Sequence, residues 1–445
     1  MREVGIGGVR SMLASGIRSP WVIAWIAMFL FVTLAFGFRK SNELIRGPQS
    51  DSYMKAASRY LSGGDVYVPP EPTSYWPYPP AMLLTVAPLA FIPEWAVRII
   101  WGGLLATCVV GSGYLITTTL LAGVADQVMR KRISICLLIS VAISHQHILS
   151  PLTYYSHDFI LVLCLAIGFA ATVKRKEIVA GCAFGIGAAL KVTPGLFFPI
   201  LLIQRRWKAL VAMFFVGAIL TVAPDVIRPQ NGETLIAGFY RIAVNSSDIS
   251  VAGGGRWPAW NPLAQNLSAT IARWTITTPP EGEEEHLTDW AVVHLDAAAR
   301  SDVTVVAFGI VLGMILCVVL ASGWKFNPEL SPLTRLNEVG AVACGMVLLA
   351  PHSSNYHFAV IYFAIASCII AVMKKRDPFL VVICIALCLL GLPSGRDLIG
   401  HYPVQVMLVY GKITFGALFA LAGCARVAQL QRRERAAALS FAYSE

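Results

Sequence analysis

Charged residues are scarce in this sequence. Asp, Glu, Lys and Arg make up 13% of its 445 residues, whereas 56% are hydrophobic, and the mean hydropathy is +0.66. Soluble globular domains carry about 25% charged residues, and a water-soluble fold cannot hide this much apolar surface. The scarcity of charge therefore excludes a soluble protein and predicts a polytopic, all-α integral membrane protein.

Long polar linkers, solenoid-type repeats and low-complexity tracts are also missing. Apolar runs recur from Trp21 to Val427 with no long linker between them. A soluble chain of this length would usually divide into two or three domains. We expect instead one transmembrane domain over residues 1–445.

The cysteines give no sign of a disulfide framework or a zinc site. All ten lie inside apolar runs and none forms a CxxC pair, which excludes both arrangements. His145 and His147 lie near His157 and Asp158 in the chain, but no pair has the i, i+4 spacing of a helical metal site and no cysteine accompanies them. We therefore predict neither a metal site nor a cofactor.

About twelve apolar segments could cross a membrane, where a spanning helix needs about 20 residues and fewer when it is broken or buried. They are residues 21–38, 95–121, 133–150, 155–173, 178–190, 192–203, 210–226, 303–322, 339–350, 358–373, 379–392 and 404–427. The first follows three arginines but has no small-residue cleavage site, so we predict an uncleaved helix. The apolar segment Ala81–Ile92 is predicted to be re-entrant or interfacial, because a full span there would place the next basic turn, Arg130–Arg132, on the external side of the membrane.

The net charge of +10 is concentrated in short turns between the apolar runs. These turns are Arg130–Arg132, Lys174–Lys176, Arg205–Lys208, Lys374–Arg376 and Arg432–Arg435. The positive-inside rule places them in the cytoplasm, so they report orientation and not nucleic-acid binding. This predicts a multi-pass protein of the cell (plasma or inner) membrane with both termini cytoplasmic and with long external loops at about 39–79 and 224–301.

Asp51 begins a stretch of helical periodicity in the first external loop. Tyr53, Ala56, Ala57 and Tyr60 follow it at a spacing that would hold a short helix against the membrane face. A carboxylate at the start of that helix would be fixed just above the lipid. Two interpretations stay open: a functional acid, or simply the helix N-cap, for which Asp is a preferred residue.

Lys191 interrupts an apolar run that a proline, Pro194, also breaks. A charge in such a run costs roughly 2.5–3.5 kcal/mol on insertion scales and usually has a function. A phosphate group at the membrane interface would be a natural partner. The alternative is a lysine that snorkels to the lipid headgroups.

Other polar clusters punctuate the apolar runs on the external side. They are Tyr154, Tyr155, His157 and Asp158; His352, Asn355, Tyr356 and His357; and Gln265–Ser268 followed by Arg273. Each cluster alone is ordinary for the outer end of a helix. Together they converge on one face of the membrane.

These motifs resemble glycosyltransferases of the GT-C fold, and within it glycosyltransferase family 87, which includes the polyprenyl-phosphate-mannose-dependent α-mannosyltransferases of mycobacterial phosphatidylinositol mannoside synthesis. The resemblance rests on residues 51–53, 64–67, 78–80, 190–194 with 205–207, 265–268 with Arg273, and 351–357. The chain departs from the family in two places, where the family often has a Trp and two histidines at 355–357 and Asn-Gln-Ser within 265–268.

The resemblance implies a GT-C-like bundle of about twelve transmembrane helices whose external loops carry short helices. It implies transfer of a hexose, mannose above all, from a polyprenyl monophosphate to a hydroxyl of a lipid-linked or glycolipid acceptor on the external face, by an inverting single displacement. The residues carried over are Asp51 as general base; Lys191, Arg273 and His357 for the donor phosphate; and Tyr53, Asp65, Tyr78, Gln265, Asn266 and Asn355 for substrate binding.

Two other functions stay open. A transporter or flippase of a lipid-linked substrate also uses broken helices and intramembrane charges, although it would be expected to show two related halves. A glycan ligase that uses a polyprenyl diphosphate would place arginines and a histidine in the large external loop, where this chain has Arg256 and Arg273 beside the acidic residues 281–285.

Overall fold

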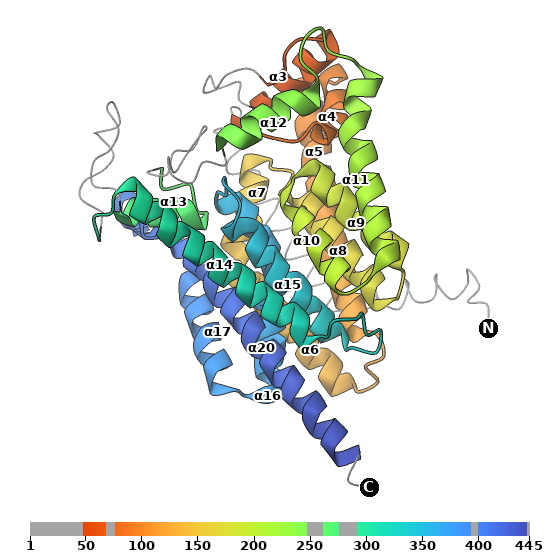
Figure 1. Ribbon diagram of the computed structural model, residues 1–445, viewed down its shortest axis with the longest axis vertical. Coiled ribbons are helices and arrows are strands. Elements are labelled where there is room, and N and C mark those ends of the chain that lie inside the picture. Colours follow the sequence, from red (N-terminus) through yellow and green to blue (C-terminus); the bar gives the residue numbers. More distant parts are fainter. Residues whose placement is uncertain (1–47, 68–75, 247–260, 276–291, 393–398, 443–445) are drawn as a thin grey trace, which may run out of the picture.

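The computed structural model describes residues 48–67, 76–246, 261–275, 292–392 and 399–442, which form a bundle of helices (Figure 1). The predicted first helix at 21–38 lies outside the described residues. Within the described part the fold is all-α, as predicted, and the one β-type contact is an isolated bridge between Ala264 and Ser354. The elements are α3 (Pro48–Ser62), α4 (Ala81–Val86), η2 (Ala87–Phe91), α5 (Glu94–Leu121), α6 (Gln127–Ile143), α7 (His145–Tyr154), α8 (Asp158–Val173), α9 (Glu177–Leu190), η3 (Thr193–Leu196), α10 (Phe197–Ile203), α11 (Trp207–Ile227), α12 (Leu235–Ser246), α13 (Leu267–Thr275), α14 (Ala297–Ala321), α15 (Pro332–Leu348), η5 (Asn355–Ile361), α16 (Tyr362–Lys375), α17 (Pro378–Leu390), α19 (His401–Val409) and α20 (Lys412–Ala442).

Five helical segments of the described part are long and apolar enough to cross a membrane, or six if one bent pair counts as a span. They are residues 99–121, 207–227, 297–321, 355–375 and 412–438, with the pair α6 and α7, bent by 60°, as the sixth. Twelve spans are therefore not confirmed. Several predicted runs fold as shorter helices, such as α9 with 14 residues and α10 with 7, because the chain breaks between them at Lys191.

The segment predicted to re-enter the membrane folds as α4 followed by the 3₁₀ helix η2. Together they cover residues 81–91, which at a rise of about 1.5 Å per residue reach about 16 Å. That is roughly half the thickness of a hydrocarbon core. This length is consistent with a re-entrant or interfacial segment and too short for a span.

Small residues let the helices approach closely. Gly181 and Gly185 lie one turn apart on α9, and a Cβ atom on Gly181 would stand 2.1 Å from the carbonyl oxygen of Ala209 on α11. This small-xxx-small spacing is a common way for membrane helices to pack, because lipid supplies no hydrophobic force between them. It fixes α9, and hence the break at Lys191, against α11.

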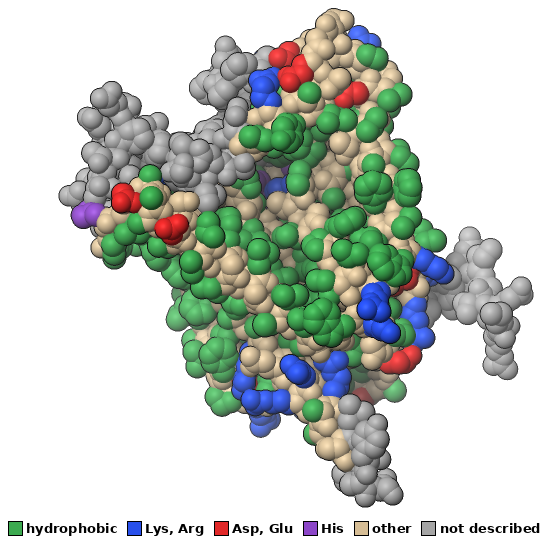
Figure 2. All heavy atoms as spheres, viewed as in Figure 1, with side chains coloured by type: hydrophobic (Ala, Val, Ile, Leu, Met, Phe, Trp, Pro, Cys, Tyr) green, Lys and Arg blue, Asp and Glu red, His purple; other side chains and the backbone are tan. Residues whose placement is uncertain are grey.

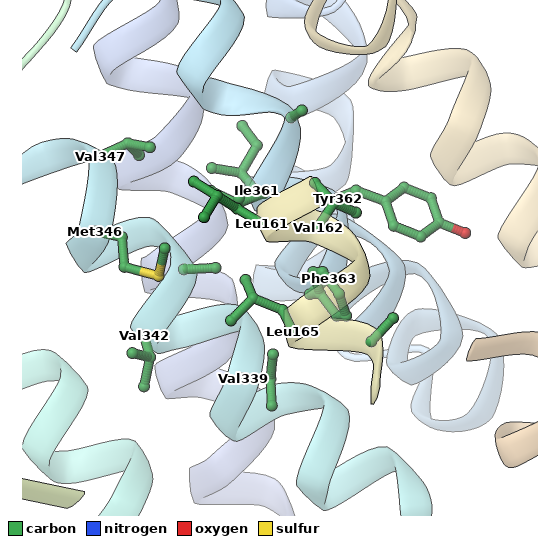
Figure 3. Close-up of a cluster of buried hydrophobic side chains, with 14 of the residues drawn as sticks. Leu161, Val162, Leu165, Val339, Val342, Met346, Val347, Ile361, Tyr362 and Phe363 are labelled. Carbon is green, nitrogen blue, oxygen red and sulfur yellow. The ribbon is translucent and has the colours of Figure 1, made fainter. Parts of the chain in front are cut away.

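The centre of the bundle is an apolar cluster between α8, α15 and α16. Leu161, Val162 and Leu165 of α8 face residues of α15 such as Val342 and Met346, and Phe363 of α16 closes the cluster (Figure 3). Every residue of α15 after Pro332 is buried. The apolar cluster holds the first residue of α8 and the last residues of α15 in fixed positions.

The basic turns gather at one end of the bundle, the lower end in Figure 2. Arg206, after α10, and Arg335, in the first turn of α15, lie on the ring of Phe326 at 4.5 and 4.3 Å. Gln204 donates a hydrogen bond of 2.8 Å to Glu338 of α15. The helix α20 ends at the same side, where Lys375 and Glu434 form an ion pair. Helices α3, α4 and α12 lie toward the other end (Figure 1).

The α9–α11 contact gives a first prediction. Gly181→Ala should lower stability by about 1–3 kcal/mol, because the added methyl group overpacks against the Ala209 backbone. Gly217→Ala on the facing helix is the matched control, since its Cβ would lie 3.7 Å from the Gly185 oxygen, an ordinary contact. Thermal unfolding of the two purified variants in detergent measures the difference, and equal midpoints would contradict the close approach.

Candidate active site

A cavity of about 630 Å³ lies below α12, between α3, the break after α9 and the end of α15. Figure 2 shows this face of the molecule hollowed there, with basic and histidine side chains visible in its depth. Most of its lining is apolar, including Val192, Leu196, Met346 and Leu349. Six of the residues predicted from the sequence line it: Tyr53, Tyr78, Lys191, Gln265, Asn355 and His357.

Lys191 reaches the cavity because the helix ends just before it. The backbone of Lys191 is extended, with φ −154° and ψ 124°, and Pro194 sits near the start of the following 3₁₀ turn. Its ammonium group does not snorkel to the headgroups: Nζ lies 2.9 Å from Oδ1 of Asp158, and the two side chains are 14% and 1% exposed. A buried carboxylate and not the membrane surface is therefore the partner of this lysine.

Asp158 is the residue that sequence reasoning did not single out. It is the first residue of α8, and its Oδ2 accepts a hydrogen bond from the Ser156 hydroxyl. Nε2 of His357 lies 3.9 Å from the same oxygen. The available signal was a carboxylate at the start of the apolar run 158–173, since an ionisable group in a membrane segment marks a functional site by default.

His357 presents an N–H group toward this carboxylate. The backbone N–H of Ser354 donates to Nδ1 of His357 at 3.2 Å, so the Nδ1 lone pair is used. In the neutral imidazole the proton is then on Nε2. Among the described residues Nε2 finds no hydrogen-bond acceptor, which leaves this donor available to a ligand in the cavity.

A cluster of buried rings forms the wall on the α3 side. Tyr53 meets Trp76, Tyr78 and Trp101 edge to face, with ring centroids 5.7 to 5.9 Å apart. The Tyr53 hydroxyl lies 3.0 Å from Nδ1 of His157. Edge-to-face pairs stabilise beyond simple burial, so Tyr53 and Tyr78 are rigid parts of the cavity wall.

Arg273 does not lie in the cavity lining. Its buried guanidinium donates to the backbone carbonyls of Val409 at 3.0 Å and of Ala264 and Asn261. It ties α13 to the end of α19, a structural role, and its predicted role as a phosphate ligand stays a prediction. An arginine whose donors are used by carbonyls has few left for a substrate.

The structure also places Asn266 and Asp65 outside the cavity lining. The amide of Asn266 donates to the carbonyl of Pro351 at 2.9 Å, which fixes the segment before His357. Asp65 is exposed, and its carboxylate accepts the backbone N–H of Tyr67 at 2.9 Å. Gln265 lines the cavity, but its amide donates to the Leu408 carbonyl at 2.8 Å. These polar groups shape the loops around the cavity.

The side chain of Asp51 lies outside the described part of the structure. Its backbone is in α3, which starts three residues earlier at Pro48, so Asp51 is in the first turn and not at the N-cap. The predicted helix itself is confirmed, and Tyr53, Ala56, Ala57 and Tyr60 are buried as its spacing predicted. Ser52 and Tyr53, directly after Asp51, line the cavity.

The cavity therefore combines an apolar lining with a few cationic or donor groups at its floor. Lys191 is the one lysine or arginine among the described lining residues, and His352 and His357 are nearby. In the same described part, no group of three His, Cys, Asp or Glu side chains stands close enough to hold a metal ion. Such a cavity suits an anionic group attached to an apolar chain.

The structural role of Arg273 gives a second prediction. Arg273→Met should lower stability by at least about 2 kcal/mol, because it leaves buried carbonyls without donors. Arg228→Met, at an exposed arginine, should leave the unfolding midpoint unchanged. A stable Arg273→Met protein that had lost only its activity would return Arg273 to the list of substrate ligands.

One of the comparisons with known proteins gives a match. The model of glycosyltransferase family 87 matches residues 76–351, a range that includes Tyr78, Lys191 and the loop up to Pro351. Neither the curated proteins nor the solved structures give a match. Because the match covers more than half of the chain, and the chain has several helices able to span a membrane, the protein belongs to glycosyltransferase family 87 and is a membrane glycosyltransferase.

Proposed function

We propose that the protein moves a hexose, mannose in the first instance, from a polyprenyl monophosphate to a hydroxyl of a lipid-linked or glycolipid acceptor. The observation that carries the proposal is that Lys191 and His357 line a mostly apolar cavity. A sugar phosphate joined to a long prenyl chain has the same division into one anionic group and a large apolar part. We treat residues 1–445 as one transferase domain.

The charge of the cavity favours a monophosphate over a diphosphate. A prenyl phosphate ester of a sugar carries one negative charge and a diphosphate ester carries two, while Lys191 is the one lysine or arginine among the described residues that line the cavity. Arg273, an arginine of the large external loop that the structure describes, is engaged with backbone carbonyls, so it gives the ligase alternative no support. No specific observation favours a transporter.

The break at Lys191 offers a path for the prenyl chain. Val192, Leu196 and Pro199 follow the lysine and line the cavity together with Met346 and Leu349 of the α15 side. Val192 is 57% exposed. An apolar wall that reaches from the floor of the cavity to the lipid is what an isoprenoid requires.

The orientation of the bundle supports an external active site. The first turn of α15 belongs to the basic end, with Arg335 beside Phe326, while the residues after its last turn, Leu349 and Ala350, line the cavity. The positive-inside rule puts the basic end in the cytoplasm. The cavity would then open on the external side, and α20 would place the C-terminus inside.

Asp51 is the proposed general base of an inverting displacement. The acceptor oxygen attacks the anomeric carbon, the bond from that carbon to the phosphate oxygen breaks, and the hydroxyl proton passes to the Asp51 carboxylate. The departing prenyl phosphate gains a negative charge, which the Lys191 ammonium and the His357 N–H stabilise. Tyr53, Tyr78, Gln265 and Asn355 lie where they would contact the sugar or the acceptor. No cofactor enters this scheme.

The test of this function is transfer of labelled mannose from polyprenyl-phosphate-mannose to native lipid acceptors by the purified protein. Asp51→Asn should reduce the rate by about 10²- to 10⁴-fold, the usual contribution of a positioned acid or base. Asp65→Asn is the matched control, because this exposed carboxylate of the same external segment lies outside the cavity and Asn keeps its acceptor oxygen. Undiminished transfer by Asp51→Asn would remove Asp51 from the mechanism.

The charge argument predicts a preference among inhibitors. Polyprenyl monophosphate should compete with the donor at least about tenfold more tightly than polyprenyl diphosphate of the same chain length, since Lys191 is the one lysine or arginine that the described cavity lining offers to a second phosphate. Competition against labelled donor at constant salt measures both constants. Tighter inhibition by the diphosphate, or transfer from a diphosphate carrier alone, would favour the ligase.

A further inference from the structure

We infer that Asp158 is a positioning residue for the donor phosphate, holding the Lys191 ammonium and the His357 imidazole in the geometry that receives it. The inference rests on the proposed function, because it concerns the same donor site. It assigns a role to a buried carboxylate that the scheme above leaves unused. Asp158 is 1% exposed and, unlike Lys191 and His357, is not among the residues that line the cavity.

The two oxygens of Asp158 serve different partners. Oδ1 accepts from Lys191 at 2.9 Å, while Oδ2 accepts from the Ser156 hydroxyl and lies 3.9 Å from Nε2 of His357. One carboxylate thus stands behind both groups that face the cavity. Its position behind them makes Asp158 unsuited to act as the base, because the acceptor hydroxyl would reach Lys191 and His357 first.

The three residues come from segments of unequal rigidity. Asp158 opens α8, which is packed in the central apolar cluster (Figure 3). Lys191 lies in the break between α9 and η3, and its long side chain has about 2 kcal/mol of rotamer entropy to lose on binding. A fixed carboxylate removes part of that freedom before the donor arrives, which is how preorganisation raises affinity.

The charge count also fits this role. An ammonium has three N–H donors, of which Asp158 takes one, so two remain for phosphate oxygens. Before the donor binds, the charges of the lysine and the aspartate neutralise each other, which reduces the cost of burying them. The Nε2 N–H of His357 can donate to the same phosphate, because Nδ1 already accepts a hydrogen bond from the Ser354 N–H.

A double-mutant cycle separates this positioning role from a purely structural ion pair. Asp158→Asn keeps an acceptor for Lys191 but leaves its charge unpaired, so the unfolding midpoint should fall. In the protein that is still folded, the looser lysine should weaken binding of polyprenyl monophosphate by about 10- to 100-fold. Donor KM should rise with little change in acceptor KM. Lys191→Met should lower the unfolding midpoint, because it leaves Asp158 buried without its cation, and the double variant should recover the midpoint without recovering transfer.

The matched control is Asp377→Asn, which removes a carboxylate from another ion pair, with Arg426 at 2.7 Å, beside the basic end of α20. Asn is also a good N-cap for α17, so this variant should keep both stability and donor KM. Wild-type prenyl phosphate binding by Asp158→Asn would overturn the inference, as would a double variant that transfers sugar normally.

The direct binding measurement keeps the two proposals distinguishable. If the wild-type protein binds prenyl monophosphate but transfers no hexose, the transferase proposal fails for that donor, while the loss of binding in Asp158→Asn still supports the positioning role. If the wild-type protein transfers hexose and Asp158→Asn matches it in binding and rate, the function stands and the role of Asp158 is wrong. A wild-type protein that binds no prenyl phosphate overturns both.

Discussion

An ammonium group inside an apolar bundle has to be met by a negative charge, and in this protein the ion pair between Lys191 and Asp158 meets that constraint. Breaking such a pair by removing one partner leaves a buried charge, which is far more costly than never having had either. The pair joins the break after α9 to the start of α8. Lys191 and Val192, the two residues at this break, both line the cavity.

The other strong polar groups divide between two ends of the bundle and hold its loops. Around the cavity, Arg273 and Asn266 use their donors on backbone carbonyls, because the irregular segments there have carbonyls that no helix satisfies. At the opposite end, Arg206 and Arg335 enclose the ring of Phe326. Charges that look alike in the sequence thus have different tasks, and the task is decided by whether a backbone carbonyl, a ring or a cavity lies within reach.

The composition and the recurring apolar runs predicted the all-α membrane fold, and the helical spacing after Asp51 predicted α3. Both predictions depend on local patterns of apolar residues. Twelve spans were not confirmed, because apolar runs do not reveal where a helix bends, as between α6 and α7. The sequence identified Lys191 as exceptional but not its partner Asp158, 33 residues away. The backbone carbonyls that Arg273 meets were not predicted for the same reason: a charge in a motif shows no sign of which acceptors the fold will bring to it.

The same ion pair has a consequence for turnover. Transfer converts a phosphate diester with one negative charge into a monoester with two, so negative charge grows on the phosphate as its bond to the sugar breaks. Asp158 takes one N–H group of the Lys191 ammonium and leaves two that can meet this charge. Because the ion pair fixes the ammonium before the donor binds, these donors need no reorganisation at the moment of reaction, which is what makes electrostatic stabilisation of a transition state effective.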